Sequence, residues 1–232
     1  MAAHIILVTP EEEVDGLANV LRTVDTTVDL ASASSLEELR ARAAARPDTR
    51  LIGFCTPLIV PADVLDALTR PAYNFHPGPP EYPGLFPAVF ALYDGAGQFG
   101  ATCHEMTAEV DGGAIVGVTR CDIRAETDRL NLEALSRQLV AHLFTEMAPA
   151  LVYTETPLQP VGEAWGTPVR RRADFDALCQ LPDDVDAAEF ERRLRAVGEG
   201  PNHALRINLH GRHFRIENTP SDGRVYVGGR PR

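Results

Sequence analysis

The segment NFHPGPPEYPGL, residues 74–85, carries the densest group of residues that could do chemistry. Asn74 and His76 stand two residues apart, so on a β-strand both side chains point to the same face. The Asn amide donates hydrogen bonds, and the imidazole donates or accepts them and titrates near neutral pH. The prolines and glycines that follow predict an extended, rigid loop suited to a pocket wall. An ordinary strand end followed by a turn is the plain alternative.

A second candidate lies in HEMTAEVDGGAIV, residues 104–116. Asp111 stands in a turn whose two glycines allow backbone shapes that side chains forbid, and a strand is expected directly after it. Asp-Gly is also among the commonest turn dipeptides, so Asp111 alone does not indicate a site. Its combination with Asn74 and His76 predicts a reaction centre made of all three side chains.

Short apolar runs alternate with helix-like segments through the first two-thirds of the chain. Strands are expected at residues 4–8, 28–31, 50–55, 73–76, 100–106 and 114–122. Helices are expected from residue 11, after the N-cap Ser35, and at residues 61–68, 87–93 and 128–151. This alternation predicts an α/β fold with an open, mostly parallel, Rossmann-like sheet.

In such a sheet ligands bind outside the carboxyl ends of the strands, where Asn74 and His76 are expected to lie. The turn after the first strand reads VTPEEE, and the sequence contains neither G-x-G-x-x-G nor a Walker motif. A dinucleotide or ATP is therefore not expected as a ligand, because the backbone cradle for phosphates is missing.

The character of the chain changes after residue 152. We predict a catalytic α/β domain over residues 1–152, a connector rich in Thr, Pro and Gly over 153–169, and a small C-terminal subdomain over 170–232. The subdomain is expected to contain a helix at 186–197 and a hairpin of strands at 204–209 and 213–217.

Composition narrows the partners and the compartment. Acidic residues outnumber basic ones 33 to 22, and a formal charge of -11 argues against a nucleic-acid partner. The four cysteines are scattered without a Cys-x-x-Cys pair, which favours reduced thiols over disulfides or a zinc site. No apolar run is long enough to span a membrane, and the N-terminus lacks a signal sequence. We expect a cytoplasmic protein with no metal and no membrane partner.

The two motifs together resemble the folate-dependent formyltransferase family, which includes methionyl-tRNA, glycinamide ribonucleotide and sugar-nucleotide N-formyltransferases. That family carries Asn-x-His-Pro, a loop, and then an Asp-x-Gly turn; here His76 and Asp111 are 35 residues apart. The segment LIGFCTPLIVPADVL, residues 51–65, is also similar to the family's segment before the Asn-x-His strand. The resemblance covers about residues 1–150.

The resemblance implies transfer of a formyl group from 10-formyltetrahydrofolate to an amine. Asn74 and His76 would donate hydrogen bonds to the oxyanion that forms when the amine attacks the formyl carbon. Asp111 would hold and charge the imidazole and help to move the proton off the attacking nitrogen. It further implies folate contacts, mostly through backbone, at Phe54, Cys55, Leu58, Ile59, Glu109 and Val110.

One departure from the family concerns the acceptor. The run Gly78–Glu81 replaces a Ser-Leu-Leu-Pro-type run and is one residue shorter. The short C-terminal extension is similar to that of sugar-nucleotide enzymes, in which it can form a dimer contact, so we expect a nucleotide-linked amino sugar as acceptor and a homodimer as an option. The alternatives are a hydroxyornithine-type amine, methionyl-tRNA, hydrolysis of the formyl-folate, and a non-catalytic folate-binding module.

Several other polar and aromatic residues are interpreted as structural. We expect His104 to be a packed or surface residue, and Trp165 and Tyr82 either to stack on an acceptor ring or to be buried at a domain seam. Solvated or turn positions are the expectation for the remaining charged groups, which are Arg170–Arg172, His210 and His213.

Overall fold

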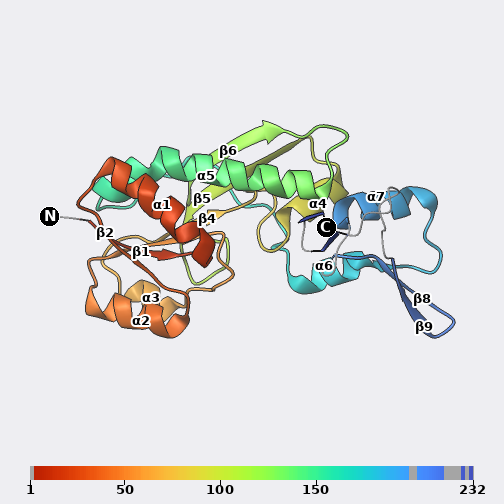
Figure 1. The fold of residues 1–232 in the computed structure, drawn as a ribbon, viewed down its shortest axis with the longest axis horizontal. Helices are drawn as coiled ribbons and strands as arrows, with labels where there is room; N and C mark the ends of the chain where they lie inside the picture. The colour runs from red at the N-terminus through yellow and green to blue at the C-terminus, as the bar shows by residue number, and fades with distance from the viewer. Residues whose placement is uncertain (1–2, 199–202, 217–225, 228–229, 232) are drawn as a thin grey trace.

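The computed structural model describes residues 3–198 and 203–216, together with the backbone of two short strands at 226–227 and 230–231. Its main sheet has the strand order β2-β1-β3-β4-β5-β6 (Figure 1). The strands are β1 His4–Val8, β2 Asp29–Ser32, β3 Arg50–Phe54, β4 Tyr73–His76, β5 Gln98–Glu105 and β6 Ile115–Asp122. The first four are parallel and the last two antiparallel, which confirms the open, mostly parallel α/β sheet.

Helices cover both faces of this sheet (Figure 1). They are α1 Glu11–Val24, α2 Leu36–Ala45, α3 Ala62–Asp66, α4 Pro87–Asp94 and α5 Arg129–Tyr153. On one face α1 and α5 bury Leu21 and Phe144 against Phe75 of β4. On the other face α2 and α3 bury Leu39 and Val64 against the strands. The strand β4 is therefore held from behind by an apolar core, which fixes the position of its polar residues.

The helix starts follow the expected side-chain caps. The hydroxyl of Ser35 accepts a hydrogen bond from the amide of Glu38 at 3.2 Å, as predicted for the start of α2. The carboxylate of Glu38 reaches back to the amide of Ser34 at 2.9 Å. At the start of α5 the carboxylate of Asp128 accepts from the amide of Asn131 at 2.8 Å. The contacts to the amides of Glu38 and Asn131 satisfy backbone donors that the first helical turn leaves free.

The C-terminal segment contains more helix than the sequence predicted. Its elements are α6 Arg172–Cys179, β7 Gln180–Leu181, α7 Ala187–Val197, β8 Arg206–Leu209, β9 Arg212–Arg215, β10 Tyr226–Val227 and β11 Arg230–Pro231. Only α7 and the hairpin were expected. The additional helix α6 starts where the Asp174 carboxylate accepts the amide of Arg171, and it buries Phe175. Glu217, the expected end of the second hairpin strand, lies outside the described residues.

The C-terminal segment shares its core with the main sheet. Phe175 of α6 stacks on Phe86 at 4.2 Å between ring centroids, and Val197 of α7 packs in the same cluster as Phe90 of α4 and Phe99 of β5. One apolar core thus continues across the connector, and the division into domains at residues 152 and 170 stays a prediction.

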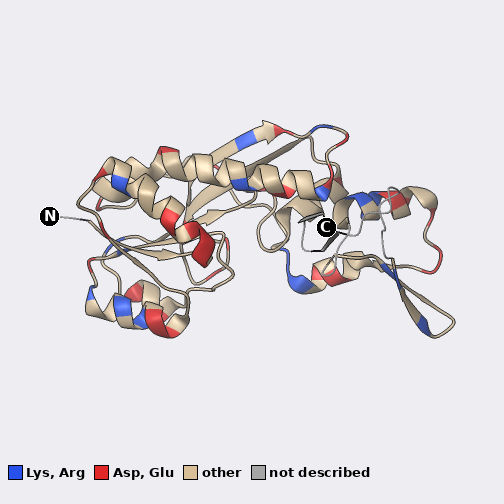
Figure 2. Cartoon of the chain, viewed as in Figure 1, with Lys and Arg blue, Asp and Glu red and all other residues tan. Residues whose placement is uncertain are grey.

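Charged side chains of both signs lie along the helices (Figure 2). On α2 and on α7 the glutamates come first and the arginines follow. Among the residues that the structure describes, no helix combines the length and the apolar character that crossing a membrane would require.

Candidate active site

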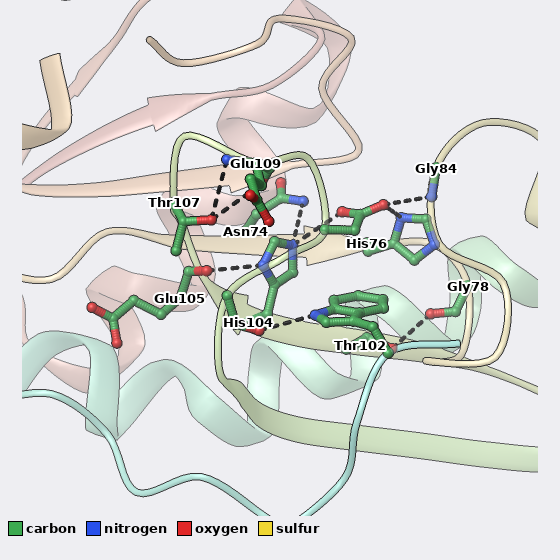
Figure 3. Close-up of polar contacts among 12 residues, drawn as sticks. Asn74, His76, Gly78, Gly84, Thr102, His104, Glu105, Thr107 and Glu109 are labelled. Carbon is green, nitrogen blue, oxygen red and sulfur yellow. Dashed lines mark hydrogen bonds and ion pairs between the residues drawn. The ribbon is translucent and has the colours of Figure 1, made fainter. Parts of the chain in front are cut away.

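The pairing of β4 with β5 brings the first two groups of the site together (Figure 3). Their antiparallel register sets Asn74 opposite His104 and His76 opposite Thr102. The Asn74 Nδ2 and His104 Nε2 atoms are 3.1 Å apart. Directly opposite residues share one face of a sheet, and here that face is opposite to the one on which Phe75 is buried. The sequence predicted a packed or surface role for His104, whereas the structure places it in the candidate site.

The turn between β5 and β6 carries Asp111 back toward these strands. The amide of Glu105 donates to the carbonyl of Ala114 at 2.9 Å and closes the turn. A Cβ atom at Gly113 would lie 1.8 Å from the carbonyl oxygen of Glu105, so only glycine fits there. Asp111 itself has a φ of 47°, in the left-handed region that few side chains adopt. The close approach of Gly113 to the Glu105 carbonyl explains why the last residue of the Asp-Gly-Gly sequence must be glycine.

The carboxylate of Asp111 is the hub of the site. Its Oδ1 atom lies 3.2 Å from His104 Nε2, and its Oδ2 atom lies 3.4 Å from His76 Nδ1. Oδ2 also accepts the amide of Gly84 at 2.7 Å. Burial raises the pKa of Asp111, but its contacts with His104, His76 and the Gly84 amide outweigh burial, so the pKa lies below its ordinary value. Asp111 is therefore an anion near neutral pH.

His76 is fixed through its Nε2 atom. Its Nε2 atom lies 3.0 Å from the carbonyl oxygen of Tyr82. Since a carbonyl can only accept, Nε2 carries the proton, and in the neutral ring the Nδ1 lone pair faces Asp111. Burial lowers the pKa of His76 below its ordinary value, against the opposing effects of Asp111 and the Tyr82 carbonyl. The imidazole is therefore neutral at physiological pH.

The loop after β4 is anchored to its surroundings at several points. The hydroxyl of Thr102 donates to the carbonyl of Gly78 at 2.8 Å, and that of Ser136 on α5 donates to the carbonyl of Pro77 at 2.6 Å. A Cβ atom at Gly78 would lie 2.6 Å from His76 Nε2, so glycine allows the loop to pass close to the imidazole. The short run Gly78–Glu81 is thus a fixed wall of the site.

The connector passes over the two imidazoles. The indole ring of Trp165 meets His76 edge-to-face at 5.8 Å and His104 at 5.0 Å between centroids. Its N–H donates to the carbonyl of Gly113 at 2.9 Å, and the next amide, that of Gly166, donates to Pro80 at 2.8 Å. Trp165 stays partly exposed. The sequence left open whether Trp165 stacks on an acceptor ring or is buried at a domain seam. Its partly exposed position beside the site allows it to stack on an acceptor.

The residues expected to contact folate differ in what they expose. The side chain of Phe54 is buried against Phe75 and Phe144, so only its backbone can meet a ligand. Burial raises the pKa of the Cys55 thiol to about 12, which leaves it uncharged and unsuited to act as a nucleophile. The remaining four expected residues range from half-buried to exposed; they are Leu58, Ile59, Glu109 and Val110.

Two residues that border the site expose apolar surface. Ile59 follows the carboxyl end of β3 and is 66% exposed, and Val110 precedes Asp111 and is 47% exposed. Among the described residues, no group of three or more His, Cys, Asp or Glu side chains is arranged to hold a metal ion.

The fold and the site together define a class of protein: an α/β enzyme with an amide, two imidazoles and a carboxylate at the carboxyl end of its central strands. The family model of the formyl transferases matches residues 7–147, and the chain therefore belongs to the formyl transferase family. The protein is a formyl transferase.

Solved structures with the same fold include N-formyltransferases. A candidate sugar N-formyltransferase from Mycobacterium tuberculosis is 23% identical, with a TM-score of 0.73 over 94% of this chain and 97% of that one. A sugar N-formyltransferase from a Shewanella species is 22% identical, with a TM-score of 0.70 over 93% and 97%. An N-formyltransferase from Helicobacter canadensis, in complex with folinic acid and dTDP-3-aminofucose, is 14% identical, with a TM-score of 0.62 over 84% and 80%. These likenesses show the shared fold.

Proposed function

We propose that this protein transfers a formyl group from 10-formyltetrahydrofolate to the amino group of a nucleotide-linked amino sugar. The observation that carries the proposal is that Asn74, His76 and Asp111 lie together at β4, a central strand of the sheet, in a member of the formyl transferase family. The acceptor class is supported by the sugar N-formyltransferases that share this fold over nearly their whole length.

The first role belongs to Asn74. An amine that adds to a formyl carbon turns the carbonyl oxygen into an oxyanion, which needs hydrogen-bond donors placed in advance. The Asn74 amide has two N–H groups, and only one of them can be used toward His104 Nε2. The second N–H remains for the oxyanion.

His76 and Asp111 act on charge and protons. His76 Nε2–H donates to the carbonyl of Tyr82 here, so to donate to the oxyanion it would exchange that carbonyl for the substrate oxygen. The anionic Asp111 would stabilise the positive charge that develops on the attacking nitrogen and draw off its proton. Collapse of the oxyanion would then break the bond between the formyl carbon and N10 of the folate, which takes up a proton and leaves as tetrahydrofolate. The Tyr82 carbonyl would have to move slightly away from His76 when both substrates bind.

The folate donor supplies the activated formyl group. Its flat heteroaromatic ring needs apolar side chains beside backbone hydrogen-bonding groups, and the borders of the site offer both. Gly53 of β3 pairs with Asn74 of β4, so the segment that leads to Ile59 starts beside the reaction centre. Val110 directly precedes Asp111 in the turn between β5 and β6. The exposed apolar surface of Ile59 and Val110 fits this ligand, because such residues otherwise favour burial.

The acceptor would enter below the connector. Trp165 offers a partly exposed aromatic surface beside His76 and His104. Arg171 lies just before α6 and is exposed, so its guanidinium group is available for a phosphate of a nucleotide carrier. Arg172 is also exposed but pairs with Asp176 at 3.2 Å, a contact that a phosphate would have to replace. A net charge of -11 does not favour tRNA as an acceptor.

The compartment and the assembly belong to the same proposal. All four cysteines are free, two of them buried, which is in keeping with the reducing cytoplasm, where we place the protein. The proposed function needs no nucleic acid, membrane or metal. A homodimer through the C-terminal segment is retained as the proposed assembly.

The test is to incubate the protein with 10-formyltetrahydrofolate, with and without a panel of nucleotide-linked amino sugars, and to follow tetrahydrofolate release. We expect release only when an amino sugar is present. Release without any amine would indicate a hydrolase. Tight folate binding without turnover on any amine would favour a binding module. Turnover only with another amine would show that this amine, and not an amino sugar, is the acceptor.

A further inference from the structure

We propose that His104 is a positioning residue whose Nε2 atom is shared between Asn74 and Asp111, so that its protonation decides which of the two it holds. The inference rests on the proposed function for its catalytic consequence. The arrangement itself rests only on contacts within this chain.

The first step is the assignment of the other ring nitrogen. His104 Nδ1 lies 3.0 Å from the carbonyl oxygen of Glu105. Because a carbonyl has no proton to donate, Nδ1 must carry one in both protonation states of the ring. The neutral form of His104 therefore has its lone pair on Nε2.

The second step concerns the two partners of Nε2. The Asn74 amide nitrogen is 3.1 Å away and can only donate, whereas Asp111 Oδ1 is 3.2 Å away and, when ionised, can only accept. A lone pair on Nε2 accepts from Asn74 and leaves Asp111 without a donor there. A proton on Nε2 donates to Asp111 and displaces the Asn74 N–H. Only one of the two contacts can be a hydrogen bond at a time.

The third step is the consequence for the reaction. Neutral His104 orients the Asn74 amide and leaves Asp111 Oδ1 without a cationic partner, while Oδ2 keeps the hydrogen bond from the Gly84 amide. An oriented amide and an anionic Asp111 are the two conditions that the proposed formyl transfer needs. Protonated His104 releases Asn74 and neutralises Asp111. We therefore infer that the neutral ring supports turnover and that protonation of His104 weakens it.

Among the described residues, few other groups act on the charge of His104. Asp111 faces it from the turn and favours the cation, while His76 on β4, if protonated, would oppose it. Trp165 covers it from the connector and does not titrate, and Glu105 contributes its backbone carbonyl. The side chain is only 3% exposed, so bulk water does not replace these partners. The β-bulge between Cys103 and His104 is a device that commonly re-aims a side chain next to a site.

Two substitutions separate positioning from mere packing. His104→Asn keeps a donor for the Glu105 carbonyl but is too short to reach Asn74 and Asp111. His104→Gln extends to the Nε2 position and offers both a donor and an acceptor that do not titrate. We expect His104→Asn to lower kcat about 10- to 100-fold with KM nearly unchanged, and His104→Gln to recover much of the rate and to lose the His104 contribution to the pH profile.

His142→Asn is the matched control, because His142 is an exposed histidine on α5 whose ion pair, among the described residues, is with Glu146 in its own helix. It should behave like the wild type. Wild-type kcat in His104→Asn, or a defect confined to KM, would overturn the positioning role.

A measurement without substrate decides the arrangement even if a variant fails to fold. Nitrogen NMR of the histidine rings should show neutral His104 protonated on Nδ1 and neutral His76 protonated on Nε2, and Asp111→Asn should lower the titration midpoint of His104. An Nε2–H tautomer for His104, or a midpoint insensitive to Asp111→Asn, would overturn the inference. If the wild type forms no formyl product with any amine, the proposed function fails, and the NMR result still tests His104.

Discussion

The reaction centre and the mouth around it are built from different kinds of contact. In the centre His76, His104 and Asp111 are at most 6% exposed, and each is tied to the backbone through Tyr82, Glu105 or Gly84. At the proposed mouth Ile59 and Val110 expose about half or more of their surface. Backbone ties hold a geometry whatever side chains surround it, whereas exposed side chains can change without loss of the fold. We therefore expect the centre to define the reaction and the mouth to define the substrate.

The largest effect is expected for Asp111→Asn. The amide keeps an oxygen for the Gly84 N–H but loses the negative charge, so kcat should fall about 10²–10⁴-fold. Steady-state kinetics measure the loss, and an unchanged circular dichroism spectrum controls for folding. A decrease of less than about tenfold would show that the carboxylate is not central to the chemistry.

Asn74→Ala should come next. It removes the proposed oxyanion donor while His104 keeps its tie to the Glu105 carbonyl, so we expect kcat to fall about 10²–10³-fold with little change in either KM. If Asn74→Ala instead raised KM at constant kcat, Asn74 would contribute to substrate binding and not to stabilisation of the transition state.

Trp165→Ala tests the mouth. Loss of the indole should raise KM for the acceptor about tenfold, corresponding to about 1.4 kcal/mol, and should affect KM for the folate less. Trp165→Phe is the matched variant, since it keeps an aromatic ring and loses the N–H that donates to Gly113. Equal KM values for the acceptor in the wild type and in Trp165→Ala would place the indole outside the binding surface.

The smallest expected effect is on stability. Folding lowers the pKa of His76 from its ordinary 6.5, so below pH 6.5 the unfolded chain binds a proton that the folded chain does not. The contribution is fully present above pH 6.5 and declines as the pH falls toward the lower folded pKa. The Asp111 pKa is also lowered, but from 3.8, so its loss begins at a more acidic pH.

Urea denaturation between about pH 7.5 and pH 5.5 measures this decline in the midpoint concentration. In His76→Gln the decline should be smaller, because the titrating ring is absent. A decline of the same size in both proteins would assign the pH dependence to other groups.

Much of the fold followed from local signals in the sequence. The apolar runs and the Ser35 cap predicted β1, α2 and β4 closely, since each depends on neighbouring residues. The helix α6 was missed because its burial depends on Phe86, a residue about 90 positions earlier in the chain. Propensity alone is weak for such a short segment.

The site divides in the same way. Asn74, His76 and Asp111 were predicted by their order and spacing. The place of His104 depends on the register of β4 and β5, and that of Trp165 on the path of the connector, and neither is local. An antiparallel pairing of residues 74 and 104 would have been the signal for His104. The hydrogen bond from His76 to the Tyr82 carbonyl could not be predicted. Every residue has a backbone carbonyl, so the sequence does not indicate which one accepts.

The most direct test of the central claim follows the formyl carbon itself. The wild type and Asp111→Asn would be incubated with 10-formyltetrahydrofolate labelled isotopically in the formyl group and with a nucleotide-linked amino sugar, and the products would be identified by mass spectrometry. We predict that the label appears on the amino sugar with the wild type and is nearly absent from it with Asp111→Asn. Label recovered as formate with the wild type, or transferred equally well by both proteins, would contradict this account.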